Sequence, residues 1–150
     1  MSTGARRKRV VIDTNVLVRT TFLKHSPISA RLYQAIASQE CILVLSPSIL
    51  AEIRDVISRD YIVAYTHTTP ASRQSYINTL IDLSTLTSGT HSVRRTSRDK
   101  KDNKFLACAH EAQAAYIVTS DRDLLDTKAY GKTKIIPPQE FVALLDRDAL

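Results

Sequence analysis

The chain has 150 residues, 43% of them hydrophobic, which suffices for one domain with a substantial core but not for two. Its net charge of +6 and pI near 9.5 favour a polyanionic partner such as nucleic acid. No apolar run approaches the roughly 20 residues of a membrane span, and the opening apolar run is too short for a signal peptide. We therefore expect a cytoplasmic protein with no membrane partner.

The cysteines and glycines exclude several further classes of site. Cys41 and Cys108 lie in apolar stretches and form no C-x-x-C pair, so we expect buried free thiols. No G-x-G-x-x-G follows a predicted strand, so no dinucleotide site is indicated. The tripeptide GKT at residues 131–133 precedes a strand and lacks the upstream glycine of a phosphate loop, so we interpret it as a chance match.

Strand and helix signals alternate from the start of the chain. Residues 9–13 (RVVID) form a short apolar run typical of a buried strand, and residues 41–46 (CILVLS) form another. Helices are predicted over residues 26–38 and 46–60. Both begin with a serine as N-cap and a proline at the first helical position, Ser26 with Pro27 and Ser46 with Pro47.

The second half of the chain continues this alternation. Apolar residues at helical spacing predict helices over residues 71–86 and 102–115. Residues 115–121 (AYIVTSD) and 132–138 (KTKIIPP) are typical of two more buried strands. Strand–helix alternation predicts an α/β domain with a central parallel sheet that is covered by helices on both faces.

Acidic residues follow the predicted strands where a parallel sheet forms its crevice. Asp13 ends the first strand, and Asp121 occupies the same place after the strand over residues 115–121. Glu52 falls just outside the apolar arc of the helix over residues 46–60. Asp102 lies in the first turn of the helix predicted over residues 102–115. Because reactive groups gather beyond the carboxyl ends of parallel strands, we expect these four acids to converge.

Each acid also has a purely structural interpretation. Asp102 suits a helix N-terminus, Asp121 an N-cap, Asp123 the first turn of a short helix, and Glu52 an exposed surface. For Asp13, which begins the sequence DTN, the only structural interpretation is a turn or an Asx motif. The expected convergence of the four acids favours a functional site over these structural interpretations. Carboxylates about 4 Å apart repel each other by roughly 4 kcal/mol per pair at an effective dielectric near 20. A hard divalent cation, Mg²⁺ or Mn²⁺, would relieve that repulsion, whereas the four histidines lack the paired spacing of a zinc site.

Basic residues gather in two segments. Arg6, Arg7, Lys8 and Arg9 form an N-terminal arm that could equally be a solvated surface. The second segment precedes and flanks Asp102 and is the predicted nucleic-acid-binding surface; it contains Arg94, Arg95, Arg98, Lys100, Lys101 and Lys104.

At these residues the chain resembles the PIN domain family, most closely the branch that contains the toxin components of bacterial toxin–antitoxin pairs (VapC-like ribonucleases). The resemblance rests on VVIDTNVLV, on LSPSILAEI, and on DKKDNKFLACAHEAQAAYIVTSDRDLL. It implies a sheet of about five strands and a metal-dependent ribonuclease active in the cytoplasm. The domain boundaries that we predict are 1–8 for the basic arm, 9–146 for the PIN domain and 147–150 for a C-terminal tail.

The resemblance also assigns roles to residues. Asp13, Glu52, Asp102 and Asp121 match the acidic catalytic quartet that holds the metal, and Asp123 matches an outer carboxylate. The expected supporting residues are Thr14, Asn15, Thr119 and Ser120, of which Ser120 departs from the glycine that many relatives have. RNA is the expected substrate, a cognate antitoxin the expected partner, and a homodimer remains open.

Two other classes of function remain as alternatives. A non-catalytic RNA-binding or protein-binding PIN module would keep the fold, although loss of an acid would be expected and all four are present. A phosphotransfer or receiver-like domain would have further acids beside the first strand and a lysine at the end of a late strand. Here the first strand offers Asp13 alone, followed by Thr14 and Asn15.

Overall fold

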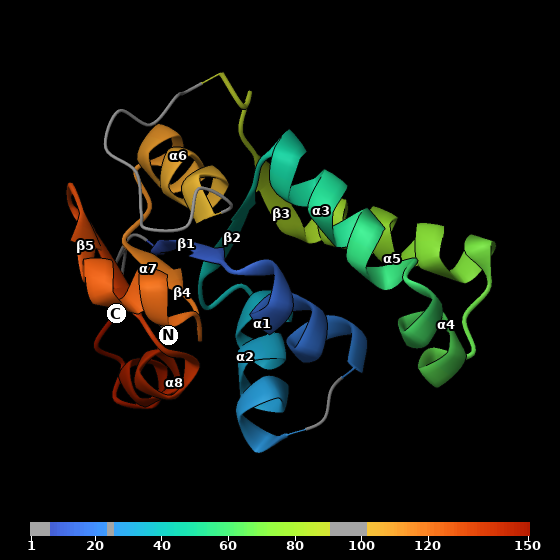
Figure 1. Ribbon diagram of the computed structural model, residues 1–150. Helices are drawn as coiled ribbons and strands as arrows, with labels where there is room; N and C mark the ends of the chain where they lie inside the picture. Colours follow the sequence, from blue (N-terminus) through green and yellow to red (C-terminus); the bar gives the residue numbers. More distant parts are fainter. Residues whose placement is uncertain (1–6, 24–25, 91–101) are drawn as a thin grey trace.

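The computed structural model describes residues 7–23, 26–90 and 102–150. Within these residues a six-stranded sheet has the order β3-β2-β1-β4-β6-β5 (Figure 1). Five strands pair in parallel with one another: β1 (Arg9–Ile12), β2 (Ile42–Leu45), β3 (Ser84–Leu86), β4 (Tyr116–Val118) and β6 (Thr133–Ile136). The two-residue strand β5 (Ala129–Tyr130) runs antiparallel to β6 at one edge. The predicted single α/β domain with a central, mostly parallel sheet is confirmed.

Helices cover the sheet on both sides. The described helices are α1 (Thr14–Val18), α2 (Pro27–Ala37), α3 (Pro47–Ile57), α4 (Asp60–Thr66), α5 (Pro70–Leu83), α6 (Asn103–Ala112), α7 (Arg122–Thr127) and α8 (Pro138–Asp146), with a π-helical turn η1 (Arg19–Leu23) after α1. Helix α6 lies over β1, β2 and β4, while α2 and α8 pack against each other on the other side of the sheet (Figure 1). Helices α3, α4 and α5 extend beyond the β3 edge.

The predicted helix starts are confirmed by their capping hydrogen bonds. The Ser26 side chain accepts from the Ser29 N–H and the Ser46 side chain from the Ile49 N–H, in each case with proline next in the chain. Helix α5 begins with the same chemistry, because Thr69 precedes Pro70 and forms a capping box with Ser72. These side chains satisfy backbone donors that would otherwise have no partner within the helix.

Two helix predictions are wrong at their ends. The helix predicted over residues 71–86 stops at Leu83, and Ser84–Leu86 pairs with β2 as strand β3, which satisfies its backbone groups in the sheet. The helix predicted over residues 46–60 breaks at Ser58 and Arg59, whose N–H groups donate to the carbonyls of Asp55 and Val56 in a tight turn. A separate helix, α4, follows and turns the chain toward the end of α1 (Figure 1).

The central strands form the core. Val10, Val11, Ile117 and Val118 are fully buried, as expected for parallel strands covered on both faces. Both cysteines are free and buried, as predicted, and burial raises the pKa of the Cys41 thiol to about 12 and that of Cys108 to about 11. These thiols therefore stay protonated and unreactive at neutral pH.

Candidate active site

Asp13 lies at the carboxyl end of β1, where the sequence predicted a functional acid. Strand β1 ends at Ile12, and Asp13 is the N-cap of α1, with its carboxylate accepting the Asn15 N–H at 3.1 Å. Its Oδ2 atom also accepts a hydrogen bond of 2.7 Å from the Thr119 hydroxyl. The Thr119 hydroxyl in turn accepts the Asp121 N–H at 2.9 Å, so Thr119 links the ends of β1 and β4.

The environment of Asp13 disfavours its negative charge. Burial is the largest cause and raises the pKa of this carboxyl above its ordinary value of 3.8, while the hydrogen bonds from Thr119 and Asn15 act in the opposite direction. The charges of Glu52 and Asp121 raise the pKa further. A cation bound among these carboxylates would reverse this effect, because it favours the ionised form.

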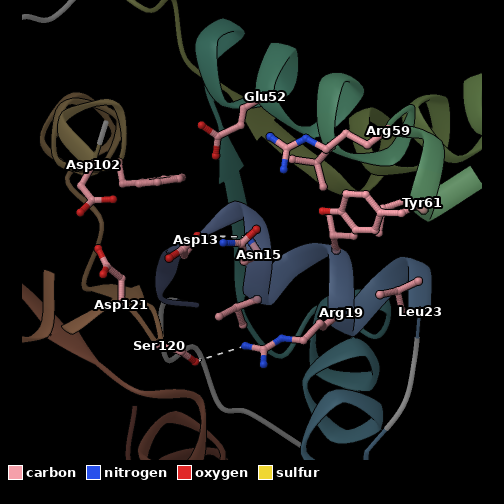
Figure 2. Close-up of a pocket in the computed structure, with 15 residues that line it drawn as sticks. Asp13, Asn15, Arg19, Leu23, Glu52, Arg59, Tyr61, Asp102, Ser120 and Asp121 are labelled. Carbon is pink, nitrogen blue, oxygen red and sulfur yellow. Dashed lines mark hydrogen bonds between the residues drawn. The ribbon is translucent and has the colours of Figure 1, made fainter. Parts of the chain in front are cut away.

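The four predicted acids line one pocket. Its volume is about 650 Å³, and its wall includes Asp13, Glu52, Asp102 and Asp121. Figure 2 shows Asp102, Asp121, Asp13 and Glu52 with their carboxylates directed into the same space, each from a different part of the chain. Asp13 and Asp102 are each 7% exposed, so two of the four acids are largely shielded from water.

Asp121 and Asp102 also occupy the helix-capping positions that the structural interpretation expected. Asp121 is the N-cap of α7 and accepts the Asp123 N–H at 3.4 Å, while Asp102 is the N-cap of α6 without a side-chain capping hydrogen bond. Asp123 is not among the residues that line the pocket. Capping and pocket lining thus coincide at Asp121, and its role as a ligand remains a prediction.

Glu52 forms an ion pair that the sequence did not predict. The Lys104 ammonium contacts the Glu52 carboxylate, with side-chain exposures of 21% and 30%. Lys104 lies in the first turn of α6, two residues after Asp102, and so brings α6 against α3 beside the pocket. Lys104 was predicted to bind nucleic acid; here its charge is directed at Glu52.

The chemistry of the donors suits a hard divalent ion. Carboxylate oxygens are the preferred ligands of Mg²⁺ and Mn²⁺, and neither His67 nor His110 lines the pocket. Within residues 7–23, 26–90 and 102–150, no three Asp, Glu, His or Cys side chains form a group that could hold an ion in this conformation. The Glu52 carboxylate instead contacts the Lys104 ammonium.

The predicted supporting residues differ in position. Asn15 and Ser120 line the pocket, and the Ser120 hydroxyl accepts a hydrogen bond of 3.2 Å from Arg19. Thr119 is fully buried beneath the pocket, where it holds Asp13. Thr14 is buried as well and does not line the pocket.

Most of the predicted nucleic-acid-binding segment lies outside the described residues, including Arg94, Arg95, Arg98, Lys100 and Lys101; so does Arg6 of the N-terminal arm. The described part of the arm lies at the amino end of β1, where Arg7 donates to Gln39 and Arg9 donates to the Ala112 carbonyl. Asp13 follows the other end of the same strand, so these arginines are remote from the pocket.

Sequence reasoning missed the cationic and aromatic residues of the pocket, namely Arg19, Arg59 and Tyr61. Arg19 follows Asn15 by four residues, so helical spacing could have placed both on one face. Nothing in the sequence signals Arg59 and Tyr61, because their position depends on the break between α3 and α4.

Comparison with known proteins assigns the family. The PIN domain family matches residues 9–123, which is more than half of the chain, and the protein therefore belongs to the PIN domain family. PIN domains are generally nucleases that act on RNA or other nucleic acid and generally use divalent metals. Among the described residues, no helix is long and apolar enough to cross a membrane.

Two individual proteins are similar to this chain. The uncharacterized protein MJ1680 of Methanocaldococcus jannaschii is 28% identical over 142 residues, and the match covers 89% of this chain and 89% of that protein. The crystal structure of PAE2754 from Pyrobaculum aerophilum superposes with a TM-score of 0.59 at 15% identity and covers 94% of this chain and 90% of that one. At this identity the second likeness supports the fold alone.

Proposed function

We propose that this protein is an endoribonuclease of the PIN type that depends on Mg²⁺ or Mn²⁺. The observation that carries the proposal is the meeting of Asp13, Glu52, Asp102 and Asp121 around one pocket at the carboxyl edge of the sheet. Asp13, Asp102 and Asp121 occupy helix N-cap positions and Glu52 pairs with Lys104, but neither role requires the four carboxylates to share one pocket. Burial is the main cause of the raised pKa of Asp13 and the charges of Glu52 and Asp121 add to it, and a bound cation would offset both effects.

The chain's own residues would hold and orient that cation. Asp13, Asp102, Asp121 and Glu52 are the candidate ligands, and a divalent ion bound there would supply an activated water and neutralise charge on the phosphate. Thr119 and the Asn15 N–H fix the Asp13 carboxylate in one orientation. Glu52 would have to exchange its contact with Lys104 for the metal, after which Lys104 is available to an RNA phosphate.

The basic segment that precedes Asp102 is the proposed path of the RNA backbone. In the sequence, the pocket acid Asp102 follows this segment directly; its basic residues are Arg94, Arg95, Arg98, Lys100 and Lys101. Such cations give affinity for phosphates without reading sequence.

We further propose that the protein acts in the cytoplasm as the toxin of a type II toxin–antitoxin pair. This assignment rests on the resemblance of the segments VVIDTNVLV, LSPSILAEI and DKKDNKFLACAHEAQAAYIVTSDRDLL to that branch of the family. An antitoxin tail that carries Arg or Lys would be attracted to the pocket carboxylates. Co-expression with the product of the gene immediately upstream tests the assignment: a cognate antitoxin should bind and suppress RNA cleavage.

Cleavage of a mixed RNA pool, compared with a DNA pool of the same sequences, tests the enzymatic proposal. Cleavage of RNA with Mg²⁺ or Mn²⁺, its arrest by chelator and its recovery when the ion is returned support it. RNA binding without cleavage under every metal condition would instead identify a non-catalytic RNA-binding module.

A further inference from the structure

The pocket continues beyond the carboxylates. Figure 2 shows the acids on one side of it and Arg19, Arg59, Tyr61 and Leu23 on the other. The wall of the pocket also contains apolar side chains, namely Val16, Val18, Val56, Ile62 and Phe105. A divalent ion needs none of these side chains, so the second part of the pocket has the character of a ligand subsite.

Tyr61 is an unusually exposed aromatic residue for a pocket wall. It lies in the first turn of α4, its exposure is 64%, and its ring is directed toward the pocket (Figure 2). Tyr65, one turn further along α4, is 61% exposed but does not line the pocket. The two tyrosines therefore share helix, residue type and exposure, and differ in access to the pocket.

Two arginines accompany Tyr61. Arg19 donates to the Ser120 hydroxyl at 3.2 Å, beside Asp121, which leaves most of the five guanidinium N–H donors for other acceptors. Arg59 pairs with Asp55 at 3.2 Å, and hydrogen bonds to Tyr61 and Asp55 raise the pKa of its guanidinium. This part of the pocket thus combines a flat aromatic face with two permanent positive charges.

We propose that this part of the pocket is a nucleotide-binding subsite, in which Tyr61 stacks on an unpaired base of single-stranded RNA while Arg19 and Arg59 bind the flanking phosphates. The inference rests on the proposed function, because it places the bound nucleotide next to the scissile phosphate. Base stacking on aromatic side chains combined with cationic contacts to phosphates is the usual physics of single-strand recognition.

Charge distinguishes RNA from a protein segment here. A basic protein tail, such as that of the proposed antitoxin, would be attracted to the carboxylates, but Arg19 and Arg59 would repel it from the second part of the pocket. An RNA strand brings negative phosphates to the arginines, while the carboxylates need a bound cation before they accept the scissile phosphate. Both halves of the pocket are therefore complementary to the same ligand, RNA with a divalent ion.

The test measures how much the bases contribute to RNA affinity when the number of phosphates is kept constant. Two fluorescent probes are compared by anisotropy with Mg²⁺ present, a mixed-sequence RNA hexamer and an abasic hexamer with the same phosphates. Asp13→Asn serves as the background so that the probes are not cleaved, and because this variant is not expected to hold the ion, the assay reports binding at the subsite and not at the scissile phosphate. The base-containing probe should bind about tenfold more tightly, since stacking contributes about 1–3 kcal/mol per base.

Tyr61 and its matched control then decide the proposal. Tyr61→Ala should reduce the preference for the base-containing probe at least fivefold, whereas Tyr61→Phe and Tyr65→Ala should keep it. An undiminished preference in Tyr61→Ala would overturn the subsite, and so would an equal loss in Tyr65→Ala. Circular dichroism of each variant excludes loss of fold, and exposed tyrosines on α4 are not expected to be needed for it.

The arginines are tested with the same two probes. Arg19→Gln and Arg59→Gln should weaken the binding of both probes equally. They should also reduce the slope of log affinity against log salt concentration by about 0.7 for each phosphate that is no longer neutralised. Arg54→Gln is the control, because Arg54 is an exposed arginine on α3 that pairs with Gln74 outside this pocket. An unchanged salt slope for both pocket arginines would contradict their assignment to phosphates.

Failure of this subsite is distinguishable from failure of the nuclease proposal. A protein that cleaves RNA with Mg²⁺ but shows no dependence of base preference on Tyr61 keeps the activity and loses the subsite. A protein that shows the Tyr61 dependence but never cleaves keeps the subsite as part of a binding module.

Discussion

The Thr119 hydroxyl donates a hydrogen bond of 2.7 Å to the Asp13 carboxylate and accepts the Asp121 N–H at 2.9 Å. One buried side chain thereby holds two pocket acids in fixed relation. Substitution of such supporting groups in metal sites typically costs about ten- to hundredfold in metal affinity or activity.

Thr119→Val is therefore expected to weaken Mn²⁺ binding and cleavage about ten- to hundredfold, and to lower the free energy of unfolding by about 1–3 kcal/mol. Thr119→Ser keeps the hydroxyl and should retain most activity. Thr133→Val is the control, because Thr133 is also buried and hydrogen-bonded, to the Ala114 carbonyl, away from the pocket. Equal loss of Mn²⁺ affinity in both valine variants would contradict the proposed role of Thr119.

The stability of the metal-free protein should depend on the protonation of Asp13. Because its pKa is raised above 3.8 on folding, the folded state binds this proton more tightly than the unfolded state. The contribution of Asp13 to the free energy of unfolding is thus most favourable at low pH and is lost as the pH rises from about 4 through the raised pKa.

Asp13→Asn should remove that dependence and raise stability at neutral pH in chelator, by roughly 1.4 kcal/mol for each pKa unit of the shift. Urea unfolding of both proteins across pH 4 to 8 measures the difference. The comparison isolates Asp13 because other carboxylates, such as Glu40 with its pKa lowered by Arg31, act in the opposite direction in both proteins. Lower stability of Asp13→Asn in chelator at pH 7 would contradict the prediction.

Lys104 is expected to compete with a metal for Glu52, because its ammonium contacts the Glu52 carboxylate. Lys104→Met removes the charge and keeps a long side chain, so half-maximal thermal stabilisation by Mn²⁺ should occur at a concentration up to about fivefold lower. Lys134→Met, an exposed lysine on β6, is the control. A higher requirement for Mn²⁺ would mean that Lys104 instead holds Glu52 in the orientation that binds the ion.

Glu111 anchors the loop from which the basic segment departs. Its carboxylate accepts the N–H groups of Ser88 at 2.7 Å and Thr90 at 3.1 Å, and α6 carries Asp102 at its other end. Glu111→Gln should cost about 1–2 kcal/mol of stability and accelerate amide exchange at these two residues. Glu140→Gln, exposed on α8, should change neither, and unaltered exchange in Glu111→Gln would refute the anchor.

The sequence predicted those features that depend on local pattern. Ser26 and Ser46 are identifiable as N-caps because the proline and the apolar spacing follow within a few residues. Asp13 and Asp121 could be placed together because buried strands are short apolar runs and parallel strands share a carboxyl edge.

Other features depend on contacts between distant residues and could not be predicted. The family resemblance indicated Thr119 as a supporting residue, but its contact with Asp13, 106 residues away, follows from no periodicity. The same holds for the contact of Lys104 with Glu52, 52 residues away. Tyr61 enters the pocket only because the chain breaks at Ser58 and Arg59, where the apolar pattern alone favours a continuing helix.

The central claim is that the pocket acids bind the metal that cleaves RNA. The most direct measurement titrates Mn²⁺ into the wild-type protein, Asp13→Asn and Asp121→Asn, with RNA cleavage assayed in the same samples and Asp82→Asn, an exposed acid on α5, as control. We predict that wild type and Asp82→Asn bind Mn²⁺ and cleave RNA, that chelator stops cleavage, and that the two pocket variants stay folded but lose both binding and cleavage. Cleavage that persists in chelator, or in folded Asp13→Asn, would contradict the claim.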